Sequence, residues 1–146
     1  MSLDILIEIG QALERKANAA LAHTAGISWA EYRLLAKLDQ AGEGGLSRVE
    51  LAEAVSLTPS GVSRALQPLA KIGLVENVKA QRDARQSRAL LTPAGEEVVA
   101  NCRPMIEESF AELPAFPLPG ESLEAYYGEL MRPRAPVFGN RPRPAR

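Results

Sequence analysis

The sequence predicts a mostly helical fold with a small two-stranded β wing, of the winged helix-turn-helix type. Two capped helices separated by about three residues occupy the middle of the chain, and two short strands with a polar tip follow them. The 146 residues suffice for one such domain with appendages. Helices at both chain ends carry apolar faces that this small domain cannot cover, so we expect two chains to share a core.

The helices before this motif follow from periodicity and capping. Apolar residues recur at steps of three or four across residues 2–22, as in an amphipathic helix. Ser28 and Glu31 form a capping box, which opens a second helix that ends near Gln40. Three glycines between positions 42 and 45 predict a loop, because glycine loses the most freedom on ordering.

The two helices of the motif are each marked by a cap. Ser47 and Glu50 form a second capping box, which opens a short helix. Thr58 caps the next helix, and Pro59 suits its first turn, where no amide partner is needed. This helix runs to about Ile72.

The wing is predicted from alternation and turn residues. Gly73 is a left-handed helix terminator, and residues 74–79 then alternate as in a strand. Residues 81–86 form a polar tip, and residues 88–91 return as the second strand. Thr92 caps the helix that follows.

Two prolines fall inside predicted helices, and a proline cannot donate the helical hydrogen bond. Pro68 is expected to bend the second motif helix, and Pro104 to interrupt and kink the helix that begins after Thr92. Ser122 is expected to cap a last short helix that ends near Met131.

These elements define the expected organisation of the chain. Residues 1–131 form the winged-helix domain, in which residues 28–95 make up the DNA-binding motif and residues 1–22 and 92–131 the dimerisation helices. Residues 132–146 hold four Pro and five Arg and are expected to form a tail without regular structure.

Charge is distributed unevenly along a chain whose net charge is only -1. Residues 47–91 carry 7 basic and 4 acidic groups, a net +3, whereas residues 92–131 carry 1 and 8, a net -7. A basic middle between acidic flanks indicates one surface that faces a polyanion on a protein that is not basic overall.

The second motif helix carries the candidate site. One face is apolar, with Val62, Leu66, Leu69 and Ile72; the other presents Ser60, Ser63, Arg64, Gln67 and Lys71 and no acidic residue. Arginine suits guanine, glutamine suits adenine, and serine and lysine suit the DNA backbone. A merely solvated face is the alternative for an isolated helix, but the preceding turn and the following basic wing favour contact with double-stranded DNA.

The wing tip adds a second candidate contact. Arg82 and Arg85 lie within four residues, and a guanidinium on a narrow hairpin can enter a minor groove. Asp83 is expected to brace one of these arginines by paired hydrogen bonds. Arg88 is expected to keep the strand face soluble in preference to contacting phosphate.

Composition excludes several other classes of protein. One Cys and one His cannot form an intramolecular disulfide or a structural zinc site, and we expect no metal, no cofactor and no catalytic residues. Cys102 is expected in the core. No apolar run is long enough to span a membrane, and the first residues lack a secretory signal, so a cytoplasmic location is expected.

The wing and its exit resemble a known family. Asp83-Ala84-Arg85, then Leu91-Thr92-Pro93-Ala94-Gly95, together with Ile72-Gly73-Leu74-Val75, is similar to the MarR (multiple antibiotic resistance regulator) family over about residues 28–112. The resemblance implies a homodimeric transcription regulator that reads palindromic operators. The expected DNA-binding residues are Thr58, Ser60, Ser63, Arg64, Gln67, Lys71, Arg82, Asp83 and Arg85.

The resemblance also implies a small-molecule pocket near the junction of the dimerisation helices and the winged part. His23, Trp29 and Tyr32 are candidates to line it, although a helix-end role suits His23 and a core role suits the two aromatic residues. An effector there would release a repressed gene by changing the spacing of the two recognition helices. The main alternative is a winged-helix adaptor that binds proteins and not DNA, and a small enzyme is a weaker one.

Overall fold

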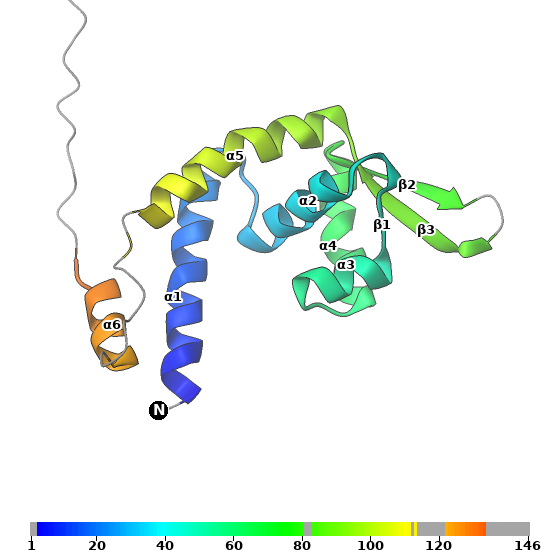
Figure 1. Ribbon diagram of the computed structural model, residues 1–146. Coiled ribbons are helices and arrows are strands. Elements are labelled where there is room, and N and C mark those ends of the chain that lie inside the picture. The colour runs from blue at the N-terminus through cyan, green and yellow to red at the C-terminus, as the bar shows by residue number, and fades with distance from the viewer. Residues whose placement is uncertain (1–2, 81–82, 112, 114–121, 134–146) are drawn as a thin grey trace, which may run out of the picture. The chain divides into compact units, whose positions relative to one another are not determined.

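The computed structural model describes residues 3–80, 83–111, 113 and 122–133. The chain divides into two compact units: residues 13–113 form the larger, and residues 1–12 with 114–146 the smaller. Within the described residues, no helix is both long and apolar enough to cross a membrane. In chain order the elements are α1 Leu3–Ala22, α2 Trp29–Ala41, the 3-10 helix η1 Gly42–Gly44, β1 Leu46–Ser47, α3 Arg48–Val55, α4 Pro59–Lys71, β2 Val75–Ala80, β3 Asp83–Leu91, α5 Pro93–Ala111 and α6 Leu123–Leu130 (Figure 1).

Helices α3 and α4 form the predicted helix-turn-helix. The Ser47 hydroxyl accepts the Glu50 N–H at 3.1 Å and the Glu50 carboxylate accepts the Ser47 N–H at 2.8 Å, which confirms the capping box. Ser56 ends α3 in the left-handed conformation, with φ 56°. Two residues later, the Thr58 hydroxyl accepts the Gly61 N–H at 3.0 Å and starts α4. The turn is therefore three residues long, as predicted.

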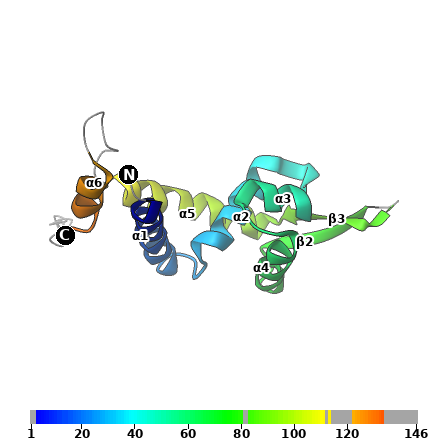
Figure 2. The same cartoon turned by 90° about the horizontal axis from the view of Figure 1, so that it is seen from below.

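The sheet has one strand more than predicted. Its order is β1-β3-β2, with both pairings antiparallel. Strand β1 has only two residues and pairs Leu46 with Ala89. Strand β3 begins at Asp83, so the predicted range of the polar tip, residues 81–86, was too long. Figures 1 and 2 show the β2–β3 hairpin projecting from the helices of the larger unit.

A close junction joins the wing to α5. The Thr92 hydroxyl donates to the Gly73 carbonyl at 2.6 Å and accepts the Gly95 N–H at 3.1 Å. A Cβ on Gly95 would lie 2.2 Å from the Leu74 carbonyl oxygen, so no side chain fits there. Gly73 itself has φ 77°, the left-handed conformation predicted for a terminator. The structure thus explains both residues of the Leu-Thr-x-x-Gly segment: the threonine hydroxyl bonds two backbone groups, and the glycine leaves room for the Leu74 carbonyl.

One hydrophobic core holds the larger unit together. It draws side chains from α1, α2, α3, α4, the sheet and α5, and the largest fully buried ones are Leu21, Leu34, Leu35, Leu38, Leu51, Leu66, Leu69, Val62, Val99 and Cys102. Cys102 lies in the core, as expected. Burying side chains from every element fixes α4 against α2 and α3, and so determines which face of α4 stays outside.

The two internal prolines do not end their helices. Helix α4 continues past Pro68 to Lys71, and α5 continues past Pro104 to Ala111. The expectation that Pro104 interrupts its helix was therefore wrong. Val99 and Ile106, on either side of that proline, pack into the same core, and this packing offsets the missing hydrogen bond.

The smaller unit contains the first part of α1 together with α6. Ser122 caps α6 by accepting the Ala125 N–H at 3.1 Å, as predicted. Ile9 and Tyr126 are buried, whereas Leu3 and Ile7 are 70% and 51% exposed. The start of α1 therefore presents large apolar side chains to solvent.

Candidate nucleic-acid interface

The polar side of α4, here called the α4 face, consists of Ser60, Ser63, Arg64, Gln67 and Lys71. Its members are exposed except for the half-buried Ser63. The opposite side buries Val62, Leu66 and Leu69 in the core. The predicted two-sided character of this helix is therefore confirmed, except that Ile72 lies beyond the helix end and is 63% exposed.

The start of α4 is fixed by its cap. The Thr58 hydroxyl, which holds the Gly61 N–H, also lies 3.2 Å from the Ser60 hydroxyl. The exposed first turn of a helix offers backbone N–H donors and the positive end of the helix dipole. Ser60 lies in this turn and Arg64 follows it four residues later, so the α4 face begins with groups that suit a phosphate.

A groove flanks the α4 face. Its volume is about 540 Å³, and it is lined by Arg48, Ser63, Leu66, Gln67, Ala70, Lys71 and Asn77. Arg48 comes from the first turn of α3 and Asn77 from β2, so three elements meet here. Among the described residues that line the groove, none carries a carboxylate.

Sequence reasoning missed Arg48 and Asn77. The Arg48 Nη2 donates to the Asn77 Oδ1 at 2.6 Å, although the two residues are 29 positions apart. Burial lowers the pKa of the Arg48 guanidinium from its ordinary value. One sequence signal could have pointed to Arg48: it is a basic residue directly after the Ser47 cap, where the positive end of the helix dipole disfavours a cation.

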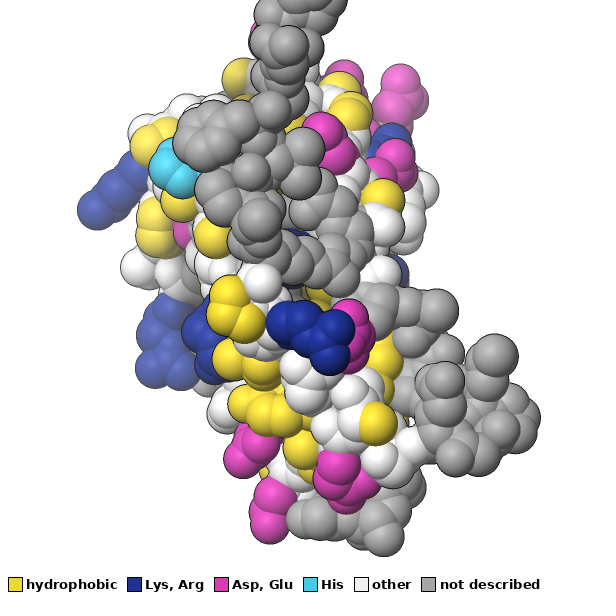
Figure 3. All heavy atoms as spheres, turned by 90° about the vertical axis from the view of Figure 1, so that its left-hand side faces the viewer, with side chains coloured by type: hydrophobic (Ala, Val, Ile, Leu, Met, Phe, Trp, Pro, Cys, Tyr) yellow, Lys and Arg dark blue, Asp and Glu magenta, His cyan; other side chains and the backbone are white. Residues whose placement is uncertain are grey.

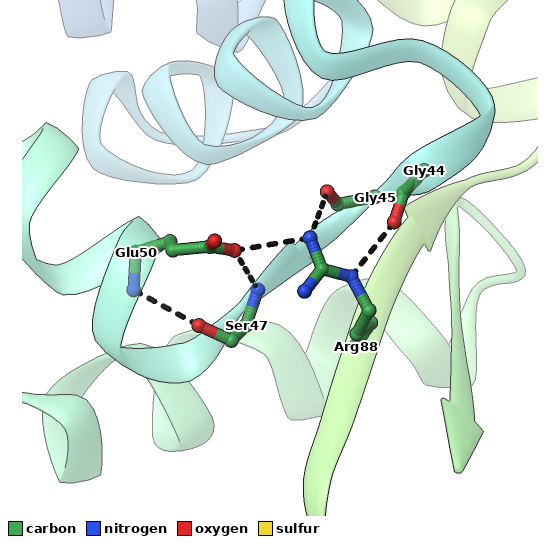
Figure 4. A network of polar contacts seen from close by, with 5 residues as sticks. All are labelled: Gly44, Gly45, Ser47, Glu50 and Arg88. Carbon is green, nitrogen blue, oxygen red and sulfur yellow. Dashed lines mark hydrogen bonds and ion pairs between the residues drawn. The ribbon is translucent and has the colours of Figure 1, made fainter. Parts of the chain in front are cut away.

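Arg88 has a different role from the one expected. Its Nε donates to the Gly44 carbonyl at 2.8 Å, and its Nη2 donates to the Gly45 carbonyl at 3.0 Å and to the Glu50 carboxylate at 3.2 Å (Figure 4). The Ser47 backbone N–H, with a smaller contribution from Arg88, holds the pKa of Glu50 below its ordinary value. Arg88 therefore ties β3 to β1 and to the start of α3, so it is neither a free solubilising group nor a free phosphate contact.

The wing residues are placed only in part. Arg82 lies outside the described residues, and so do the side chains of Asp83 and Arg85, whose backbone belongs to β3. The expected bracing of an arginine by Asp83 stays a prediction. The hairpin that carries these residues extends beyond the helices of its unit (Figure 2).

The three candidate pocket residues have different surroundings. Trp29 and Tyr32 stack with ring centroids 5.7 Å apart, and Trp29 also meets Phe110 at 6.3 Å. Tyr32 is buried, and that burial raises its pKa despite the nearby Arg103. His23, the one histidine of the chain, lies at the surface (Figure 3). Tyr32 therefore belongs to the core and Trp29 packs against it, while His23 is open to solvent.

The described residues hold no group of three His, Cys, Asp or Glu side chains that could bind a metal ion. Cys102 is fully buried, and burial raises the pKa of its thiol. Since the thiolate is the reactive form, this cysteine has a packing role.

The fold has relatives of known structure. A family model for the MarR family matches residues 25–86. Sco3205 from Streptomyces coelicolor, a MarR family transcriptional regulator solved in complex with DNA, is 31% identical over 73% of this chain and 70% of that chain, with a TM-score of 0.69. The apo form of MarR from E. coli is 25% identical over 79% of this chain and 87% of that chain, with a TM-score of 0.65.

A third structure supports the fold alone. The MepR–DNA complex from S. aureus is 23% identical over 77% of this chain and 82% of that chain, with a TM-score of 0.71. A comparison with curated proteins found no match. The family model and the similarity to Sco3205, together with the capped helix-turn-helix and its wing, show that this chain belongs to the MarR family of transcriptional regulators, which are not enzymes.

Proposed function

We propose that this chain binds double-stranded DNA as a homodimer and represses a gene by occupying a palindromic operator. The observation that carries the proposal is the α4 face, an exposed row of neutral and basic groups on a helix whose other side is locked in the core. The solved complex of Sco3205 with DNA supports the DNA-binding part of the proposal, because Sco3205 is a MarR family regulator with this fold.

In this proposal the two helices within residues 47–71 act together as the unit that contacts the DNA. Ser60, Ser63 and Arg64 contact the DNA near the start of α4, with Thr58 fixing the first turn. Gln67 and Lys71 extend the contact toward the helix end. Arg82 and Arg85 on the wing contact the adjacent minor groove, where negative potential is concentrated. Asp83 positions one of these arginines by paired hydrogen bonds.

Dimerisation is assigned to residues 1–22 and 92–131. The exposed Leu3, Leu6 and Ile7 support this assignment, since they lie at helical spacing on the first turns of α1. Two-fold symmetry would place the two α4 faces about 34 Å apart, one turn of DNA. Replacing Leu6 and Ile7 by Glu should then yield monomers in sedimentation and weaken DNA binding; a wild type that sediments as a monomer at micromolar concentration contradicts the assignment.

An effector would act on the distance between the two α4 faces of the dimer. We propose that a small organic molecule binds beside Trp29 and Tyr32, with His23 near the entrance, and favours an arrangement that does not fit the operator. Such a switch needs only a ligand that prefers one of two arrangements. The protein would work in the cytoplasm, with residues 132–146 as an appended tail.

The test is selection of bound sites from a pool of random duplexes. A two-fold symmetric motif, bound by two chains with an affinity that falls steeply with salt, is the expected result. An unenriched pool, or binding without salt dependence, would favour the protein-binding adaptor over the DNA-binding regulator.

A further inference from the structure

The groove beside the α4 face contains an arginine that the stability of the free protein does not explain. Arg48 makes one side-chain hydrogen bond, to Asn77. Its Nη1 is buried, and in the described part of the chain it is the one buried side-chain nitrogen or oxygen without a hydrogen-bond partner. The side chain as a whole is half-buried, so its guanidinium is partly withdrawn from water. A guanidinium in such a place usually has a carboxylate beside it, and the described lining of this groove supplies none.

The position of Arg48 adds to this cost. It occupies the first turn of α3, where the positive end of the helix dipole repels a cation. Lys71 lines the same groove from the last turn of α4. Two cations therefore share one groove that also offers the neutral polar groups of Ser63, Gln67 and Asn77. An anion with several acceptor oxygens would satisfy this set.

We propose that the groove binds one phosphate of the DNA backbone between Arg48 and Lys71, with Asn77 as the residue that positions the Arg48 guanidinium. This inference rests on the proposed DNA-binding function and adds Arg48, which lies outside the α4 face, to the DNA contacts. A phosphate bound by residues of both motif helices fixes the position of α4 along the DNA. The contact is independent of sequence, because every nucleotide carries the same phosphate.

The first experiment measures the salt dependence of affinity by fluorescence anisotropy. The probes are a labelled duplex recovered by selection with the wild type and a scrambled duplex of equal length. Arg48→Met should weaken binding to both by a similar factor, about tenfold, and reduce the magnitude of the salt slope by about one. Arg48→Lys keeps the charge and should keep the wild-type slope. Lys37→Met, on the half-exposed side of α2 and outside both the assigned dimerisation segments and the proposed DNA contacts, is the matched control and should change neither value.

A double-mutant cycle tests the role of Asn77. Asn77→Ala should weaken binding in the wild-type background and have no further effect in the Arg48→Met background, because it acts through Arg48. Additive losses would show that Asn77 contacts DNA directly and would overturn its positioning role. Arg48→Met should also unfold at the wild-type temperature or above, since it removes a half-buried charge that has no carboxylate partner in the groove.

The remaining outcomes separate this inference from the proposed function. If Arg64→Met loses affinity while Arg48→Met keeps the wild-type affinity and slope, the protein binds DNA but the groove holds no phosphate. A loss confined to the selected duplex would assign Arg48 to base recognition and overturn the phosphate site. A wild type that binds neither duplex would overturn both the inference and the proposed function.

Discussion

Two groups of polar residues at the helix-turn-helix differ in whether their hydrogen bonds are satisfied within the protein. At the start of α3, Arg88 binds two backbone carbonyls and the Glu50 carboxylate (Figure 4). On the α4 face, Arg64 and Lys71 lie on the solvent side of a helix that has no acidic residue. A cation that the fold already pairs contributes to structure, and one left open to solvent can bind a partner.

This contrast predicts that the two sites respond in opposite ways to mutation. Changes on the α4 face should alter DNA affinity and leave stability nearly unchanged, while changes around Arg88 should do the reverse. Mutations at the two sites therefore separate a binding surface from a structural one.

The largest effect is expected from charge reversal on the α4 face. Arg64→Glu replaces a cation beside the DNA by an anion, so affinity for the selected duplex should fall about 100-fold. Arg85→Glu on the wing should also weaken binding. Anisotropy titration measures both losses, and thermal unfolding should show little change, since Arg64 is exposed. Binding that survives both reversals would point to a protein-binding adaptor.

A loss of stability is expected at Arg88. Arg88→Met leaves two backbone carbonyls and the Glu50 carboxylate without their donor, and the free energy of unfolding should fall by about 1–2 kcal/mol. The ion pair itself is half exposed, so most of this loss belongs to the carbonyl hydrogen bonds. Urea denaturation measures the change, and the salt slope of DNA binding should stay that of the wild type. A lower slope would show that Arg88 contacts a DNA phosphate.

A smaller effect is expected at the cap of α4. Thr58→Ala removes the acceptor of the Gly61 N–H and should cost about 1 kcal/mol of stability. Thr58→Ser keeps the oxygen and should recover most of the loss, which urea denaturation of the two variants can compare. Equal losses in both variants would mean that the methyl group, and not the cap, stabilises the turn.

The smallest effect is a pH dependence at Glu50. The Ser47 N–H, and secondarily Arg88, hold the folded pKa of Glu50 below its ordinary value. A depressed carboxyl pKa stabilises the fold above the unfolded pKa, and this contribution is lost as the pH falls through the folded value. The gap in unfolding temperature between wild type and Glu50→Gln should therefore narrow in acid, while Glu53→Gln on the same helix serves as control. A gap that stays constant with pH would contradict the assignment.

Local signals predicted the part of the fold that local contacts determine. The caps at Ser28, Ser47 and Thr58 each bond a residue three positions later, so they can be recognised in a short window of sequence. The amphipathic pattern of α4 was equally visible, because one face of a helix repeats every three or four residues. These signals were sufficient for the helix-turn-helix and the α4 face.

Long-range contacts explain what sequence reasoning missed. Strand β1 has two residues and exists because Leu46 pairs with Ala89 across the chain. The contact between Arg48 and Asn77 and the ties from Arg88 to Gly44 likewise join distant positions. The prediction that Pro104 interrupts its helix considered only a local effect, the lost hydrogen bond. The packing that offsets this loss comes from the whole core and cannot be recognised in a short window of sequence.

The most direct test of the account is solvent protection of the α4 face by DNA. Cys102 is fully buried, so a cysteine placed at Ser60 or Gln67 would be the reactive thiol for a maleimide reagent. The account predicts that the selected duplex slows labelling of Ser60→Cys and Gln67→Cys strongly and leaves Gln40→Cys, exposed on α2, unaffected. Equal labelling rates at Ser60→Cys and Gln67→Cys with and without the bound duplex would contradict it.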